Sequence, residues 1–246
     1  MNFKRLFTAV AIVSSFLSSS YAQEKTYYVG IGAADVMDTY LSPYSYDGIG
    51  MSVAREVQYG HTLHNLELSL SSLESMAGNV NEYAGNIRYS IAHQFDLLQV
   101  DGLTVKAGPM GTMQAGGVYN ERNGNNPGNA HVSLMADLSA RVGYDLRLFN
   151  RTFPLQYTIA VPVLGIAYSP AFGQSYYEEF ILGNADHNIK LAHISNTPSL
   201  RHRFTIAIPA GRRFIRIGYE GDYAQSVYNH LRYHNYTHNL VIGLQM

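Results

Sequence analysis

The sequence contains no cysteine and no tryptophan among its 246 residues. Without cysteine, a disulfide scaffold, a thiolate zinc site and thiol catalysis are all excluded. Only 14% of the residues are charged, against about 25% in an ordinary soluble domain, so an ordinary water-facing surface is excluded as well. The formal net charge of −1 gives no sign of a nucleic-acid partner.

Long apolar runs are also missing. Beyond the N-terminus, no run approaches the roughly 20 residues that a membrane-spanning helix needs. The sequence is instead rich in glycine, with 22 residues, and in tyrosine, with 20. Its aromatic and β-branched residues are too frequent for a disordered chain. These features together indicate one β-rich domain.

Residues 1–22 have the character of a secretory signal peptide. Lys4 and Arg5 form a positive region, an apolar stretch follows, and Ser20 and Ala22 place small residues at the −3 and −1 positions of a cleavage site. The alternative, an N-terminal membrane anchor, needs a longer apolar run. We therefore expect an exported protein.

Residues 23–246, expected to form a single domain, alternate between apolar and polar side chains. From Ala130 to Leu148 every even-numbered residue is apolar, and from Glu82 to Leu97 most odd-numbered residues are. A period of two is typical of a strand with one apolar and one polar face. We count ten strands, with eight or twelve as alternatives.

The connections between these strands alternate in length. Short turns are expected near Gly60, 99–101, Asn150 and 210–211, and long polar loops over 36–46, 75–81, 118–129, 169–198 and 223–229. Outer-membrane barrels have this asymmetry, with short periplasmic turns and long external loops. The pattern predicts an all-β fold, an up-and-down antiparallel transmembrane β-barrel.

The orientation of the apolar face decides between two kinds of barrel. In a soluble, lipocalin-like barrel the apolar face points inward, whereas in a membrane barrel it points outward. Small residues such as Gly30, Ser52 and Ala92 occupy the polar face, which suits a crowded lumen. We therefore favour the bacterial outer membrane, with membrane lipids and lipopolysaccharide as partners and an unknown surface ligand as a further possibility.

Charged residues on the polar faces form a candidate network inside the barrel. Its members are Glu56, Glu67, Arg88, Asp137, Arg141, Arg201, Arg203, Arg216 and Glu220. One interpretation is structural, because unpaired charges away from bulk water are costly; the other is the selectivity lining of a pore. An eight-stranded barrel is filled by its own side chains, so ten strands favour the structural interpretation and a narrow polar lumen.

Two histidine patterns invite chemical interpretations. His230, His234 and His238 are four residues apart, but on a strand that spacing spans about 13 Å, too far to share a metal ion, so we expect no metal site. His193 and Ser195 sit two residues apart, so on a strand we expect them to share one face, where an imidazole can activate a hydroxyl. With Asn196 they form a His-x-Ser-Asn segment that resembles the signature of outer-membrane lipid A deacylases.

A catalytic histidine of that kind also needs an acid to orient it. The next acid along the chain is Glu220, on a different expected strand, and Asp186 lies upstream in a loop. The alternative is a loop segment ended by Asn196 and Pro198. No nucleophile elbow, phosphate loop or dinucleotide fingerprint is present, and we expect no cofactor.

Two longer segments carry a family resemblance. The run Asp38 to Pro43 with Tyr46 and Gly48, and the runs 196–202 and 238–243, resemble a family of Gram-negative outer-membrane barrels classed as a domain of unknown function. The resemblance covers nearly all of the mature chain. It implies an outer-membrane barrel with no established activity, and a structural loop-to-strand junction at Asn196.

Two function classes follow from the sequence. The first, which we favour, is a non-enzymatic outer-membrane protein, structural or surface-binding, with residues 176–180 of the longest loop as contact candidates. The second is a lipid hydrolase that uses Ser195 and His193.

Overall fold

The computed structural model describes residues 23–124, 126–184 and 187–246. The predicted signal peptide therefore lies outside the described residues. The described elements are β1 (Gln23–Asp38), β2 (Tyr46–Tyr59), β3 (Thr62–Ser75), β4 (Asn81–His93), β5 (Phe95–Val100), β6 (Leu103–Asn120), β7 (Gly128–Leu148), β8 (Arg151–Tyr168), the π-helical turn η1 (Tyr177–Ile181), β9 (Ile189–His193), β10 (Leu200–Ala210), β11 (Arg213–Tyr228) and β12 (Leu231–Gln245). Across these ranges, no helix has the length and apolar character needed to cross a membrane.

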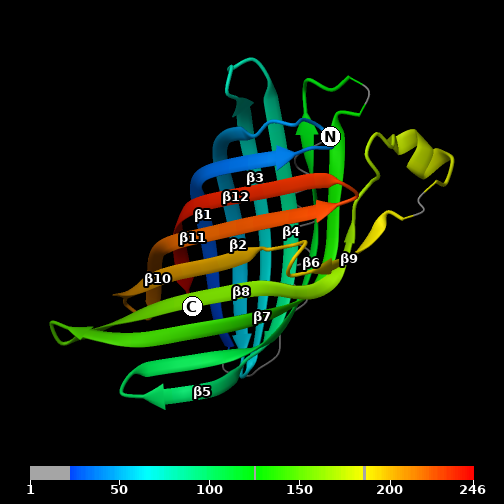
Figure 1. The fold of residues 1–246 in the computed structure, drawn as a ribbon. Coiled ribbons are helices and arrows are strands. Elements are labelled where there is room, and N and C mark those ends of the chain that lie inside the picture. Colours follow the sequence, from blue (N-terminus) through cyan, green and yellow to red (C-terminus); the bar gives the residue numbers. More distant parts are fainter. Residues whose placement is uncertain (1–22, 125, 185–186) are drawn as a thin grey trace.

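The strands form one closed antiparallel barrel (Figure 1). Most strands pair with the next along the chain, except that β4 pairs with β6 and β8 with β10; β1 pairs with both β2 and β12, and the β8–β10 pairing completes the ring. Two places in the ring are shared. The strands β4 and β5 pair in succession with β6, and β9 and β10 pair in succession with β8. The barrel therefore has ten strand positions, as the sequence predicts.

The connections also alternate as predicted, with two exceptions, one of which is that the strand β9 lies inside the predicted loop over 169–198. Tight turns join β7 to β8 at Phe149–Asn150 and β5 to β6 at Asp101–Gly102, where positive φ angles of 42° to 81° suit the hairpin turns of twisted strands. The predicted loop over 223–229 is wrong. The strand β11 continues to Tyr228, and a tight turn at Asn229–His230, with φ of 50° and 64°, leads directly into β12.

The apolar faces of the strands point outward. Exposed fractions are 55% for Ile31, 55% for Leu134, 61% for Leu138 and 70% for Leu240, while their polar neighbours are turned inward. A soluble monomer rarely exposes so large a continuous apolar surface. The fold is thus a barrel of the transmembrane type, and a lipocalin-like barrel is excluded.

The inside of the barrel is crowded, and glycine makes the crowding possible. A Cβ atom on Gly32 would lie 1.8 Å from the carbonyl oxygen of His238, and one on Gly218 would lie 1.9 Å from that of Phe204. Neither contact is sterically possible, so only glycine lets these strands approach so closely. The remaining interior space is filled by long polar side chains, which form the site described next.

Candidate functional site

All nine charged residues singled out in the sequence lie in ion pairs inside the barrel. Their strands place them there through the period of two, because each belongs to the inward face of its strand. Most are largely buried, with exposed fractions of 5% for Arg88, 3% for Asp137 and 9% for Arg203. Buried charges of this kind are stable only when each has a well-placed partner.

Arg88 on β4 lies at the centre of the network. Its Nη1 atom lies 3.1 Å from Oε1 of Glu67 on β3, and its Nη2 atom lies 2.5 Å from Oδ2 of Asp222 on β11. Its Nε atom donates to the side-chain oxygen of Gln114 on β6, at 3.3 Å. One guanidinium therefore links strands on opposite sides of the barrel across the lumen.

A second group of pairs lies nearer the tight turns. Arg203 pairs with Glu220 on the neighbouring strand and also reaches Oε2 of Glu56 at 3.4 Å. The other oxygen of Glu56 accepts from Nη2 of Arg141 at 2.7 Å. Arg216 donates to Gln245 at 2.6 Å and to the hydroxyl of Thr205 at 3.1 Å.

Two chambers of the lumen lie on either side of the centre of the network. The loop-side chamber has a volume of about 100 Å³ and the turn-side chamber about 90 Å³. Arg88, Arg201 and Asp222 line both, so these three side chains form the partition between them. Arg201 is fixed there by its ion pair with Asp137.

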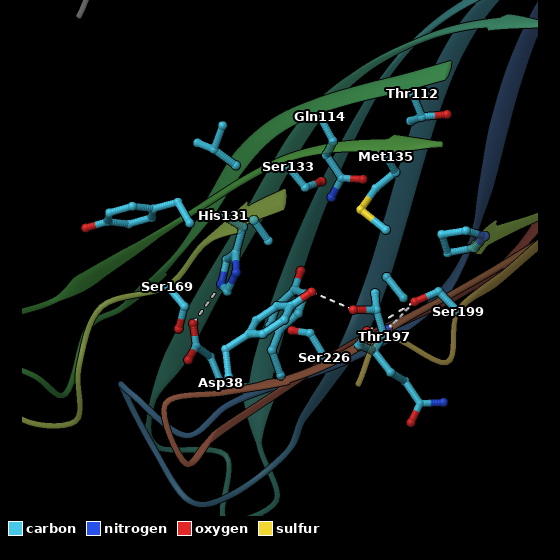
Figure 2. Close-up of a pocket in the computed structure, with 18 of the residues that line it drawn as sticks. Asp38, Thr112, Gln114, His131, Ser133, Met135, Ser169, Thr197, Ser199 and Ser226 are labelled. Carbon is cyan, nitrogen blue, oxygen red and sulfur yellow. Dashed lines mark hydrogen bonds and ion pairs between the residues drawn. The ribbon is translucent and has the colours of Figure 1, made fainter. Parts of the chain in front are cut away.

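The loop-side chamber has polar and apolar walls. Asp38 accepts from the side chain of Asn129 at 2.8 Å and lies 2.9 Å from Nε2 of His131. The ring of Tyr233 stacks on His131, with centroids 3.9 Å apart. Figure 2 shows His131 and Asp38 on one side of this chamber, with Thr197 on the opposite side.

The longest loop is anchored by hydrogen bonds to its neighbours. The buried carboxylate of Glu179 accepts from Asn188 at 2.6 Å and from the hydroxyl of Tyr168, and the Tyr40 hydroxyl donates to the carbonyl of Gln174 at 2.5 Å. Burial raises the pKa of Tyr40, so this hydroxyl keeps its proton at neutral pH.

A capping box begins the helical turn of this loop. The backbone N–H of Ser175 donates to the Glu178 carboxylate at 2.7 Å, and the N–H of Glu178 donates back to the Ser175 hydroxyl at 3.3 Å. The N–H and the hydroxyl of Ser175 both donate to the Glu178 carboxylate and lower the pKa of Glu178. Glu178 and Glu179 therefore hold the loop together, and among the described side chains of residues 176–179 it is Tyr177, 61% exposed, that faces outward.

The family assignment follows from comparison with known proteins. The family profile described as "Protein of unknown function (DUF3316)" matches residues 3–246. This chain belongs to the DUF3316 family. The family resemblance predicted from the sequence is thereby confirmed. No curated protein matches the chain significantly.

Several solved structures are similar to this DUF3316 chain. Neisserial surface protein A is 10% identical, with a TM-score of 0.35, and the match covers 93% of this chain and 99% of that one. The translocator domain of the autotransporter NalP from Neisseria meningitidis is 12% identical, with a TM-score of 0.41 and coverage of 98% and 93%. The β domain of the Bordetella autotransporter BrkA is 10% identical, with a TM-score of 0.40 and coverage of 92% and 99%. The fold of the DUF3316 chain is established by its own strand pairing.

The structure brings the sequence-predicted pair His193 and Ser195 together at the end of β9. The Ser195 hydroxyl lies 2.6 Å from Nδ1 of His193. The two residues do not share a strand face, because Ser195 lies in the turn that follows the strand. Glu220 is paired with Arg203 inside the barrel, so it does not orient His193. Asp186 lies outside the described residues.

The three evenly spaced histidines lie in separate surroundings in the DUF3316 structure. His234 lies 2.7 Å from the carboxylate of Asp35, and Nδ1 of His238 lies 2.6 Å from the hydroxyl of Tyr219. His230 belongs to the β11–β12 turn. In the described ranges of the chain, no group of three or more histidine, aspartate or glutamate side chains is placed to hold a metal ion.

The sequence analysis missed two members of the DUF3316 lumen. Asp222 shares the inward face of β11 with Glu220, but it precedes a segment that was expected to be a loop. Asp38 is the last residue of β1, within another expected loop. Continuing the period of two identifies both, by one step from Glu220 to Asp222 and by two steps from Ala34 to Asp38.

Proposed function

We propose that this protein resides in the outer membrane of a Gram-negative bacterium and acts there as a structural or surface-binding barrel with a closed lumen. One observation carries the proposal: an apolar exterior surrounds an interior that is filled by paired charges. The exterior suits lipid, and the paired charges leave little free path for solutes. Membrane lipids and lipopolysaccharide are the immediate partners of such a surface.

The long loops supply the binding surface in this proposal. Phe172 is 77% exposed and Ile181 is 69% exposed in the longest loop, and Tyr44 is 65% exposed in the loop between β1 and β2. Exposed apolar side chains on ordered loops are typical of contact surfaces. Because hydrogen bonds anchor the longest loop, these side chains are displayed on a fixed frame.

Fractionation and conductance test the proposal together. We expect the protein in the outer-membrane fraction, where unboiled and boiled samples differ in gel mobility because a closed barrel resists detergent. Purified protein in a planar bilayer should give no conductance steps. A variant with Arg88→Ala and Arg201→Ala lacks the partition and should conduct. Steps from the native protein contradict the closed lumen, and a soluble protein contradicts the membrane location.

Lipid hydrolysis is the second candidate function. The hydrogen bond of 2.6 Å between Ser195 and His193 favours it, because an imidazole in contact with a hydroxyl is the basis of serine hydrolases. A Ser195→Ala variant expressed in the native envelope decides the matter. Unchanged lipid A and phospholipid profiles, compared with those of the native protein, eliminate the hydrolase.

A further inference from the structure

The barrel wall has a break between β8 and the segment that joins β9 to β10. Pairing on this side of β8 stops at Ala160 with Arg201 and resumes at Leu164 with His193. Residues 161–163 of β8 therefore face residues 194–200 without a ladder. We call this break the seam. The role argued below for the seam rests on the membrane location proposed above.

The local sequence keeps the seam from closing. Pro162 and Pro198 lie on its two sides, and neither has a backbone N–H to contribute to a ladder. On its other edge, β8 has a bulge: Asp137 pairs with Pro162 and Ala136 with Leu164, so Val163 is an extra residue. A bulge bends the strand and interrupts its pairing.

The joining segment is held by β11 instead of β8. The Val227 N–H donates to the carbonyl of Asn196 at 2.9 Å, and the Ser199 hydroxyl exchanges hydrogen bonds with the backbone of Gln225 at 2.9 and 3.1 Å. The hydroxyls of Thr197 and Tyr228 lie 2.5 Å apart. The segment thus follows β11, and the gap remains on its β8 side.

The seam borders the loop-side chamber. Pro162 from one side and Thr197 and Ser199 from the other side all line that chamber. Outside, the seam is surrounded by lipid-facing side chains, with Leu164 51% exposed, Leu191 62% exposed and Ile194 56% exposed. Unpaired backbone at membrane depth is tolerated only where it lines a cavity or is buried in protein. The seam therefore lies between the chamber and the apolar exterior, with no backbone ladder across it.

Arg201 lies at the β10 end of the seam, in the pair of β8 and β10 that is next to the gap. Its side chain is 18% exposed, more than that of any other arginine in the lumen network. Its bonds to Asp137 and Thr112 both come from Nη2, which leaves Nε and Nη1 for a ligand. Counting Arg201, the chamber is lined by three acids and three arginines, namely Asp38, Asp137, Asp222, Arg88, Arg201 and Arg232.

We propose that the seam and the loop-side chamber form a binding site for a single-chain carboxylate amphiphile, a fatty acid. Its carboxylate bonds to the free guanidinium atoms of Arg201, and its chain leaves through the seam along Leu164 and Ile194. The chamber volume of about 100 Å³ equals about three water molecules. This volume suits a carboxylate and the first carbons of a chain, while the tail stays in the bilayer.

The absence of native cysteine allows a direct test. The variant Val161→Cys with Leu200→Cys joins the first unpaired position across the seam. Its matched control, Ile166→Cys with Leu191→Cys, joins a pair already in register between β8 and β9. The probe is a hexadecanoic acid with a diazirine near its carboxyl end, added to the full chain in lipid nanodiscs and mapped by mass spectrometry after illumination.

We expect adducts on chamber residues such as Gln114 and Ser133 in the native protein and in the oxidised control. In the oxidised seam variant they should fall at least tenfold and return on reduction. Where that disulfide does not form because the gap is too wide, Ser199→Trp fills the seam and should give the same loss, whereas Ser199→Ala should not.

Three results overturn the proposal. Adducts confined to outward-facing residues place the fatty acid in the surrounding lipid only. Equal chamber labelling with the seam closed means that the ligand enters elsewhere. Unlabelled hexadecanol and hexadecanoate are each added in competition with the probe. If both reduce the chamber adducts equally, Arg201 is not the carboxylate site. Gel mobility and liposome flotation of the same variants report membrane insertion separately, so a failure of the membrane proposal is distinguishable.

Discussion

Glu67 and Arg88 stand directly opposite each other in the β3–β4 register, and their side chains form an ion pair of 3.1 Å inside the barrel. Both are almost completely buried. The pairing of two strands thus also brings together two charges that neither strand could bury alone. The same register that closes the wall builds the network in the lumen.

Removing one partner of this pair should destabilise the barrel strongly. In Arg88→Ala, the carboxylates of Glu67 and Asp222 lose their cation, and we expect the free energy of unfolding to fall by about 3–5 kcal/mol. Urea titration in lipid vesicles, followed by gel mobility, measures the change. Arg151→Ala is the control, because Arg151 is exposed at the start of β8, and its effect should stay within about 0.5 kcal/mol. Equal effects would contradict the structural role of the network.

Two glycines on separate strands of the wall, Gly32 on β1 and Gly111 on β6, should respond differently to alanine. A Cβ on Gly32 collides with the His238 carbonyl oxygen at 1.8 Å, whereas on Gly111 its nearest contact is Ile91 at 3.8 Å. Gly32→Ala should cost at least about 1–3 kcal/mol and lower the yield of heat-modifiable barrel, while Gly111→Ala should match the native protein. If the Gly32→Ala variant folds with the stability and yield of the native protein, then β1 and β12 are farther apart than described.

A charge on the outer face should be costly only inside the apolar belt. Met51 is 55% exposed on β2, and Met76 is 99% exposed in the loop after β3. Arginine at the middle of the lipid-facing band costs about 2–4 kcal/mol, so Met51→Arg should lower stability in lipid vesicles by this amount. Met76→Arg should leave it unchanged. Equal tolerance at both positions would mean that β2 does not face lipid.

The fold could be predicted from the sequence as far as the residue pattern within each strand shows that strand's two faces. The period of two indicates which residues face inward, and the nine charged residues that it places on the polar faces lie on the inward faces of their strands. Strand ends are less visible. The segment 223–229 is rich in polar and small residues and reads as a loop, yet it forms strand because β12 supplies a partner along its whole length.

The breaks in the wall lie beyond sequence reasoning for a different reason. Whether residues 161–163 find a partner depends on where β9 ends and β10 begins, and so on a neighbour about 30 residues away along the chain. The two prolines at the seam are visible in the sequence, but only the strand pairing shows that they face the same gap. The same holds for the contact between Asp38 and His131, which joins residues from β1 and β7.

Single-cysteine scanning of β7 from residue 132 to residue 142 tests the membrane-barrel account most directly, since the native chain has no cysteine to interfere. Each variant carries a spin label, and its collision rates with oxygen and with a water-soluble nickel complex are measured in lipid vesicles. The account predicts a strict alternation, with the even-numbered positions Val132, Leu134, Leu138 and Val142 in contact with lipid and the odd-numbered positions shielded from it. Even-numbered positions that collide with the nickel complex, or a pattern without a period of two, would contradict it.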